Sequence, residues 1–327
     1  MLEHGGKLQD ASQKYGIPLD QWIDLSTGIN PRGWMPPRPP DSVWLRLPEE
    51  HDELEQVACS YYGCDSLLAV AGSQQAIQLL PTLRSRSKVG FVSPGYGEHP
   101  YAWKCHNHQV RPIAADEVER HLDEIDVLVL CNPNNPDGGL FTAAQLSAWH
   151  ERLNARGGWL IVDEAFMDAT PQWSLAKTVP LGGLIILRSL GKFFGLAGAR
   201  VGFVLADNPL LLQMREKLGP WTIAGPSRWV AAKALADSEW QTKARQELGL
   251  AADRLKRLLS GAGLPPRGGT VLFQYVRHRE AGQIAHLLAQ EGILVRLFSE
   301  PASLRFGLPG TADEWARMEA CFKRLFR

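Results

Sequence analysis

The chain has 327 residues, of which 45% are hydrophobic, so it is long enough for one large domain or for a large and a small one. Its 35 Lys and Arg residues balance its 35 Asp and Glu residues, and no basic stripe is visible, which argues against nucleic-acid binding. The five scattered cysteines lack metal-ligand or redox spacing, no signal-peptide core is present, and the longest apolar run, residues 179–187, is too short to cross a bilayer. We expect a soluble cytoplasmic protein without a metal or a membrane partner.

The first part of the chain predicts few regular elements. A helix is expected over about residues 7–15, ended by Gly16. Residues 24–31 are typical of an extended segment that enters a turn, and the proline-rich residues 36–40 form a stiff connector that excludes a helix. A second helix is predicted over residues 50–62.

Strands and helices then alternate. Short apolar runs predict strands at residues 67–70, 88–92, 110–113, 126–130, 159–162, 184–187 and 201–205. Helices are predicted between several of them, at residues 73–83, 99–106 and, most clearly, 142–154. This alternation predicts an α/β fold with a mainly parallel sheet covered by helices on both faces.

The last part of the chain has a different pattern, which predicts a smaller α+β domain. Helices are expected at residues 226–236, 239–260, 280–291 and 311–326, with strands at 270–276, 293–296 and 303–307. We place the large domain at residues 41–235 and the small C-terminal domain at 236–327. The long helix near this boundary is expected to join them.

A glycine-rich loop follows the predicted strand 184–187 and brings Ser189, Lys192 and Arg200 close together in sequence. Ser and Arg are suited to a phosphate group, and a lysine with a lowered pKa is suited to Schiff-base chemistry with an aldehyde. Gly191-Lys192 is followed by Phe193 rather than Ser or Thr, so a P-loop is excluded. Taken alone, such a loop is more often a solvated basic surface than a binding site.

Three motifs in order resemble the fold-type I pyridoxal-phosphate enzymes: the Asn-Pro turn at residues 132–138, the strand end at residues 162–166, and the lysine loop at residues 189–202. The resemblance implies pyridoxal 5'-phosphate as the cofactor, with Lys192 and Asp163 as the catalytic residues. It also implies a homodimer with the active site at its interface, and an N-terminal arm, residues 1–40, that packs with the small domain.

Further cofactor-binding residues follow from the same resemblance. Asp163 would lie beneath the pyridine nitrogen, Asn135 would bond the phenolic oxygen, and Tyr96 would stack on the ring. The phosphate would be held by Ser73, Gln74, Ser189 and Arg200. The strand–turn–helix order around Ser73 supports this independently, because free N–H groups at a helix start bind anions. The ordinary alternatives are a plain helix cap at Ser73, a turn asparagine at Asn135 and a tyrosine that only packs in its loop at Tyr96.

The substrate residues are expected near both ends of the chain. Arg305 resembles the family arginine that binds the substrate α-carboxylate. The N-terminal His4-Gly-Gly and the segment at residues 24–31, which contains Gly28, resemble the threonine-phosphate decarboxylases of cobalamin biosynthesis. That group would take a phosphorylated amino acid, with His4 and Arg296 as candidates for its phosphate and with Asn135 also near the substrate. His99, His106 and His108 are interpreted as solvated or packing residues.

Two alternatives remain open. Nearly all of these residues are shared with histidinol-phosphate aminotransferases, which usually have a tyrosine where this chain has Phe166 and a Tyr-Pro-Asp segment where it has Leu47-Pro-Glu49. Both differences favour a role other than transamination, and they are also compatible with weaker cofactor binding. The second alternative is a catalytically silent scaffold, which would be expected to have lost Lys192 or Asp163, and both are present.

Overall fold

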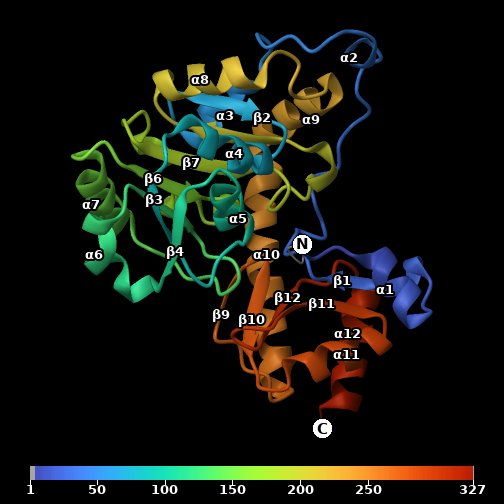
Figure 1. Ribbon diagram of the computed structural model, residues 1–327. Coiled ribbons are helices and arrows are strands. Elements are labelled where there is room, and N and C mark those ends of the chain that lie inside the picture. The colour runs from blue at the N-terminus through green and yellow to red at the C-terminus, as the bar shows by residue number, and fades with distance from the viewer. Residues whose placement is uncertain (1–3, 327) are drawn as a thin grey trace. The chain divides into compact units, whose positions relative to one another are not determined.

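The computed structural model describes residues 4–326, which form two compact units (Figure 1). The larger unit consists of Trp34–Asn135 and Leu140–Gln241. The smaller unit combines the chain up to Gly33, the short segment Pro136–Gly139 and the chain from Thr242 onwards. None of the described helices combines the length and the apolar character that crossing a bilayer requires.

A seven-stranded sheet forms the centre of the larger unit, in the order β2-β8-β7-β6-β5-β3-β4. Its strands are β2 (Leu67–Val70), β3 (Lys88–Val92), β4 (Gln109–Ile113), β5 (Val127–Cys131), β6 (Trp159–Asp163), β7 (Leu184–Ser189) and β8 (Gly202–Leu205). The strands β4, β3, β5, β6 and β7 pair in parallel, and β8 runs antiparallel to both β7 and β2. The predicted mainly parallel sheet is thus confirmed, and every strand except β8 ends at the same edge.

The helices of the larger unit cover this sheet. They are α2 (Ser42–Leu45), α3 (Leu54–Tyr62), α4 (Ser73–Leu79), α5 (Glu98–Cys105), α6 (Val118–His121), α7 (Ala143–Asn154), α8 (Asn208–Leu218), α9 (Gly225–Ala236) and the start of α10 (Ser238–Gly261). Short 3-10 turns lie at Leu80–Leu83, Ala115–Glu117, Leu122–Glu124, Met167–Ala169, Pro171–Trp173, Ala176–Thr178 and Ala197–Ala199. The start of α7 is fixed by a capping box, in which Thr142 and Gln145 satisfy each other's free backbone N–H groups. The sequence analysis missed α8, although Asp207 caps it by accepting a hydrogen bond from Leu210 N.

The smaller unit contains a five-stranded sheet in the order β1-β11-β12-β10-β9. Its strands are β1 (Ile23–Leu25), β9 (Gly268–Thr270), β10 (Phe273–Arg277), β11 (Ile293–Phe298) and β12 (Ser303–Gly307). Its helices are α1 (Leu8–Tyr15), α11 (Ala281–Gln290), α12 (Ala312–Leu325) and the rest of α10, and a 3-10 turn lies at Leu19–Gln21. The blue β1 pairs in parallel with the red β11, so the N-terminal segment is part of this sheet (Figure 1). The single strand predicted at residues 270–276 is wrong in detail, because a turn at Leu272, which donates from its N–H to Thr270 Oγ1, separates β9 from β10.

A buried ion cluster joins the ends of β6 and β7. Arg188, which is 1% exposed, donates to Glu164 Oε2 over 2.6 Å and to Asp168 Oδ1. Ser174 Oγ and the Leu175 N–H also donate to Glu164, over 2.5 and 2.9 Å. Burial raises the pKa of Glu164, and the charge of Arg188 opposes that effect. Glu164 therefore has a structural role, as the shared acceptor of this cluster.

We expect Arg188→Met to lower the free energy of unfolding of the larger unit by about 3–5 kcal/mol, because two buried carboxylates would lose their counter-charge. Urea denaturation measures the loss. The control is Arg152→Met, which breaks an exposed pair with Asp123 and should cost less than about 1 kcal/mol. Equal losses in the two variants would contradict this role for the cluster.

Candidate active site

The candidate site of the larger unit lies where β2, β5, β6 and β7 end and where β8 begins. The strand register places Cys131 opposite Asp163, and it places both Val70 and Ser189 opposite Gly202. Polar residues that follow these strands therefore meet at one edge of the sheet, where open α/β folds bind their ligands. All eight predicted cofactor residues belong to the larger unit: Ser73, Gln74, Tyr96, Asn135, Asp163, Ser189, Lys192 and Arg200.

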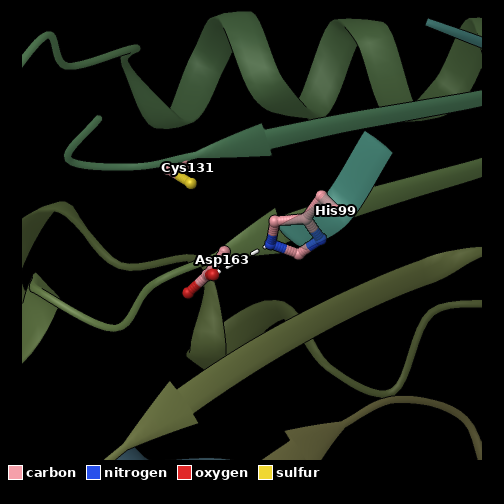
Figure 2. Close-up of side chains that lie close together, drawn as sticks. All are labelled: His99, Cys131 and Asp163. Atoms are coloured by element: carbon pink, nitrogen blue, oxygen red, sulfur yellow. Dashed lines mark hydrogen bonds and ion pairs between the residues drawn. The ribbon is translucent and has the colours of Figure 1, made fainter. Parts of the chain in front are cut away.

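Asp163 is buried and holds two hydrogen bonds at the end of β6. His99, on the first turn of α5, lies with its Nε2 atom 2.9 Å from Asp163 Oδ2 (Figure 2). The Ala165 N–H donates to Asp163 Oδ1 over 3.0 Å. Both residues are less than 5% exposed. A buried carboxylate fixed in this way is a directed acceptor for a ligand that carries a positively charged N–H group.

Tyr96 precedes α5 and connects the Asp163 region to the start of α4. Its hydroxyl donates to Gln74 Oε1 over 3.3 Å, and Gln74 Nε2 donates to Glu98 Oε2 over 2.7 Å. Its ring also meets the His99 ring edge to face, with 6.1 Å between centroids. Burial, and then the charge of Asp163, raises the pKa of the Tyr96 hydroxyl, so it remains a donor at neutral pH.

An anion cradle is formed at the start of α4. A Cβ atom on Gly72 would lie 2.6 Å from the Arg200 guanidinium, and a Cβ atom on Gly202 would lie 2.5 Å from Ser73 N. The two glycines therefore allow the guanidinium and the helix start to approach the same place. Ser189 lies opposite Gly202 on β7, so its hydroxyl reaches the same end of the sheet. Free N–H groups, a hydroxyl and a guanidinium together suit a phosphate.

Lys192 and Asn135 complete the set in the larger unit. The Lys192 Nζ atom lies 5.5 Å from the centroid of the Phe166 ring, three residues beyond Asp163. A lysine amine after β7 thereby lies close to the segment that follows the buried carboxylate at the end of β6, the neighbouring strand. Asn135 lies in the turn after β5, where Asn132 fixes the loop by exchanging hydrogen bonds with the backbone of Phe141.

The four other predicted residues, His4, Gly28, Arg296 and Arg305, belong to the smaller unit. Arg296 on β11 and Arg305 on β12 are register partners, so the two guanidinium groups project from the same face of the sheet. Arg305 is buried and donates to Ser26 O over 2.8 Å. His4 and Arg296 line one cavity of about 450 Å³ between α1, α11 and β11. Gly28 has a φ of 64°, which explains a glycine in that turn.

His99 is the residue that sequence analysis underestimated, since it was assigned to packing or solvent. Its partner Asp163 is remote in the sequence, and the only available signal was its position one helical turn after Tyr96. His108 is a packing residue as expected: it is buried, accepts from the Ser87 N–H and lies 2.9 Å from Pro81 O. His106 is exposed.

The chain belongs to the family of class I and II aminotransferases, whose model matches residues 45–319. It is 53% identical to a threonine-phosphate decarboxylase of Pseudomonas aeruginosa, over 98% of this chain and 97% of the relative. A second threonine-phosphate decarboxylase, from a Sinorhizobium species, is 39% identical over 97% of this chain and 98% of its own.

Solved structures share the fold. The histidinol-phosphate aminotransferase of Clostridium acetobutylicum has a TM-score of 0.83 at 21% identity, covering 92% of this chain and 98% of its own. The histidinol-phosphate aminotransferase of Sinorhizobium meliloti was solved in complex with pyridoxal-5'-phosphate. It has a TM-score of 0.81 at 20% identity, covering 99% of this chain and 96% of its own. The expected fold-type I architecture is thus confirmed.

The residues of the larger unit fit the predicted pyridoxal phosphate. A buried carboxylate suits its ring nitrogen, the glycine-lined cradle suits its phosphate, and the Lys192 amine suits its aldehyde.

We expect His99→Asn to weaken the binding of pyridoxal phosphate about 10-fold or more, because a hydrogen bond to a charged group contributes about 1.5–3 kcal/mol. Titration of the apoprotein, followed by cofactor absorbance, measures the change. His106→Asn alters an exposed histidine at the end of the same helix and is the control. If both variants bind as tightly as the wild type, His99 does not support the Asp163 carboxylate.

Proposed function

We propose that this protein is a pyridoxal-phosphate-dependent carboxy-lyase that converts L-threonine O-3-phosphate to (R)-1-aminopropan-2-yl phosphate and carbon dioxide, in cobalamin biosynthesis. The relatives of 53% and 39% identity that carry this name span nearly the whole chain. The structural observation that carries the proposal is the register pair Arg296–Arg305. Like charges directly opposite on neighbouring strands destabilise a sheet, and a substrate with both a carboxylate and a phosphate offsets that cost.

Each residue has a defined task in this reaction. Pyridoxal phosphate, when bound, supplies an electron sink for the bond that breaks at the substrate Cα. Asp163 accepts a hydrogen bond from the ring N–H, and His99 holds that carboxylate in place. Lys192 would hold the cofactor aldehyde through its Nζ atom and would carry a proton to or from the substrate Cα. Ser73, Ser189 and Arg200 hold the cofactor phosphate.

The choice of reaction depends on how the substrate is turned. The bond that breaks is the one held perpendicular to the plane of the cofactor ring. We infer that Arg305 binds the carboxylate while His4 and Arg296 bind the substrate phosphate, so that the carboxylate is the perpendicular group. Phe166 offers no hydroxyl where the aminotransferases usually have a tyrosine, which supports the lyase over the alternative, a histidinol-phosphate-type aminotransferase.

We further propose that the protein is a homodimer in the cytoplasm. Residues 35–47 of the larger unit expose four large apolar side chains: Met35 is 83% exposed, Trp44 66%, Leu45 84% and Leu47 63%. Such a concentration is typical of a surface covered by a partner. The scattered, odd number of cysteines supports a reducing compartment.

The test of the reaction is to incubate the purified protein with pyridoxal phosphate and L-threonine O-3-phosphate and to identify the product by mass spectrometry. We expect aminopropanol phosphate and carbon dioxide, with both absent for Lys192→Ala. An intact substrate, together with transamination of histidinol phosphate by 2-oxoglutarate, would show that the protein is an aminotransferase.

We expect Arg296→Gln to raise the KM for L-threonine O-3-phosphate about 10-fold to 100-fold, because a charged hydrogen bond to the phosphate is lost. Steady-state kinetics measure the change. Arg257→Gln, which alters an exposed arginine of α10, is the control and should leave the KM unchanged. An unchanged KM for Arg296→Gln would remove this arginine from the substrate site.

Exchange of exposed apolar residues tests the dimer. The double variant Trp44→Glu and Leu45→Glu should be monomeric in analytical ultracentrifugation, because charges would replace apolar surface at the interface. Leu250→Glu alters a singly exposed leucine of α10, 73% exposed, and should remain dimeric. A monomeric wild-type protein would exclude the homodimer.

A further inference from the structure

Three buried side chains in the candidate site, beside the ends of β5 and β6, have the chemistry of metal ligands. His99 projects from α5, Cys131 ends β5 and Asp163 ends β6, and their ligand atoms all lie within 4.8 Å of one another (Figure 2). Cys131 and Asp163 are register partners on neighbouring parallel strands, so the backbone itself fixes their spacing. All three are at most 5% exposed. The family resemblance explains Asp163, but it gives no role to the thiol.

We propose that the apoprotein binds a borderline divalent cation, Zn²⁺, through His99 Nε2, Cys131 Sγ and Asp163 Oδ2, and that this ion competes with pyridoxal phosphate. One nitrogen, one sulfur and one oxygen form a donor set that zinc accepts, with the fourth position left for water. The competition, unlike the site, rests on the proposed role of Asp163 toward the cofactor ring, because one carboxylate serves both ligands.

Coordination requires side-chain rotations, and the larger one is that of the thiol: Cys131 Sγ lies within 4.8 Å of the other two donors. A tetrahedral zinc site with a Zn–S bond of about 2.3 Å separates sulfur from nitrogen or oxygen by about 3.6 Å, so the thiol has to approach by up to about 1.2 Å. Zinc bonds to His nitrogen and carboxylate oxygen of about 2.0–2.2 Å in a tetrahedral arrangement separate the two donor atoms by about 3.3 Å. The His99 and Asp163 donors are 2.9 Å apart, so their hydrogen bond has to open by a few tenths of an ångström. The other Asp163 oxygen keeps its bond from the Ala165 N–H, which would orient the carboxylate toward the ion.

Charge balance favours the ion in this buried place. A thiolate, a carboxylate and a neutral imidazole carry two negative charges, which one divalent cation neutralises. A neutral complex avoids the cost of burying an uncompensated charge. Binding releases the Cys131 thiol proton to solvent. The proton between His99 Nε2 and Asp163 passes to His99 Nδ1 if the imidazole is neutral and to solvent if it is doubly protonated, so the coordinated imidazole is neutral in either case. The cofactor has to reach the same carboxylate, so an ion can follow the same route in the apoprotein.

Cobalt(II) is the probe, because its thiolate complexes absorb in the near ultraviolet and its four-coordinate complexes absorb in the visible. Cofactor-free, chelator-treated protein is titrated with Co²⁺. We expect a thiolate-to-cobalt band that saturates at about one ion per chain, as three donors and water around one ion require. The band should be lost in Cys131→Ser and kept in Cys105→Ser, which removes an exposed thiol beside His106. Circular dichroism establishes that the Cys131→Ser variant is folded.

The wild-type protein provides a second test that needs no variant. Added pyridoxal phosphate should abolish the cobalt band as the cofactor absorbance grows, and Zn²⁺ should slow cofactor uptake. A wild-type apoprotein without the band, or a band that persists in folded Cys131→Ser, overturns the metal site. A band that persists while the cofactor binds overturns the competition alone. Failure of the cofactor to bind at all would count against the proposed enzyme and leave the cobalt result unaffected.

Discussion

The buried carboxylate of Asp163 is the constraint on which the candidate site depends. A charge at the end of a buried strand is stable only if donors surround it, and His99 and the Ala165 N–H meet that need. The strand direction then determines the rest, because β2, β5, β6 and β7 end at the same edge of the sheet. The buried Arg188 cluster joins the ends of β6 and β7, so the segments that follow Asp163 and precede the lysine loop are tied to each other.

The smaller unit supplies a complementary kind of chemistry. Its sheet places Arg296 and Arg305 side by side, and Arg305 is further fixed by its bond to the backbone of Ser26. Paired guanidinium groups suit a ligand with two anionic groups, whereas the larger unit offers a carboxylate, an amine and an anion cradle. This division matches an enzyme in which one part of the chain binds a ring cofactor and another part selects a doubly anionic substrate.

The sequence predicted most of the strands well because they are short apolar runs, and three of them, Leu67–Val70, Lys88–Val92 and Ser303–Gly307, have the predicted bounds. The cofactor residues stay a prediction, which rests largely on three motifs that resemble a family with a fixed order of loops. The His99–Asp163 bond was not predictable from spacing, since it joins a helix and a strand that only the folded sheet brings together. The helix α8 was missed although Asp207 and Pro209 form a recognisable helix start.

The central claim is that Asp163, held by His99, keeps the ring nitrogen of bound pyridoxal phosphate protonated. The most direct measurement is the ¹⁵N chemical shift of cofactor labelled at that nitrogen, bound to the wild-type protein and to Asp163→Asn. We predict the shift of a protonated pyridine nitrogen in the wild type and that of an unprotonated one in the variant, because an amide does not stabilise the positive ring. An unprotonated nitrogen in the wild-type protein would contradict the account.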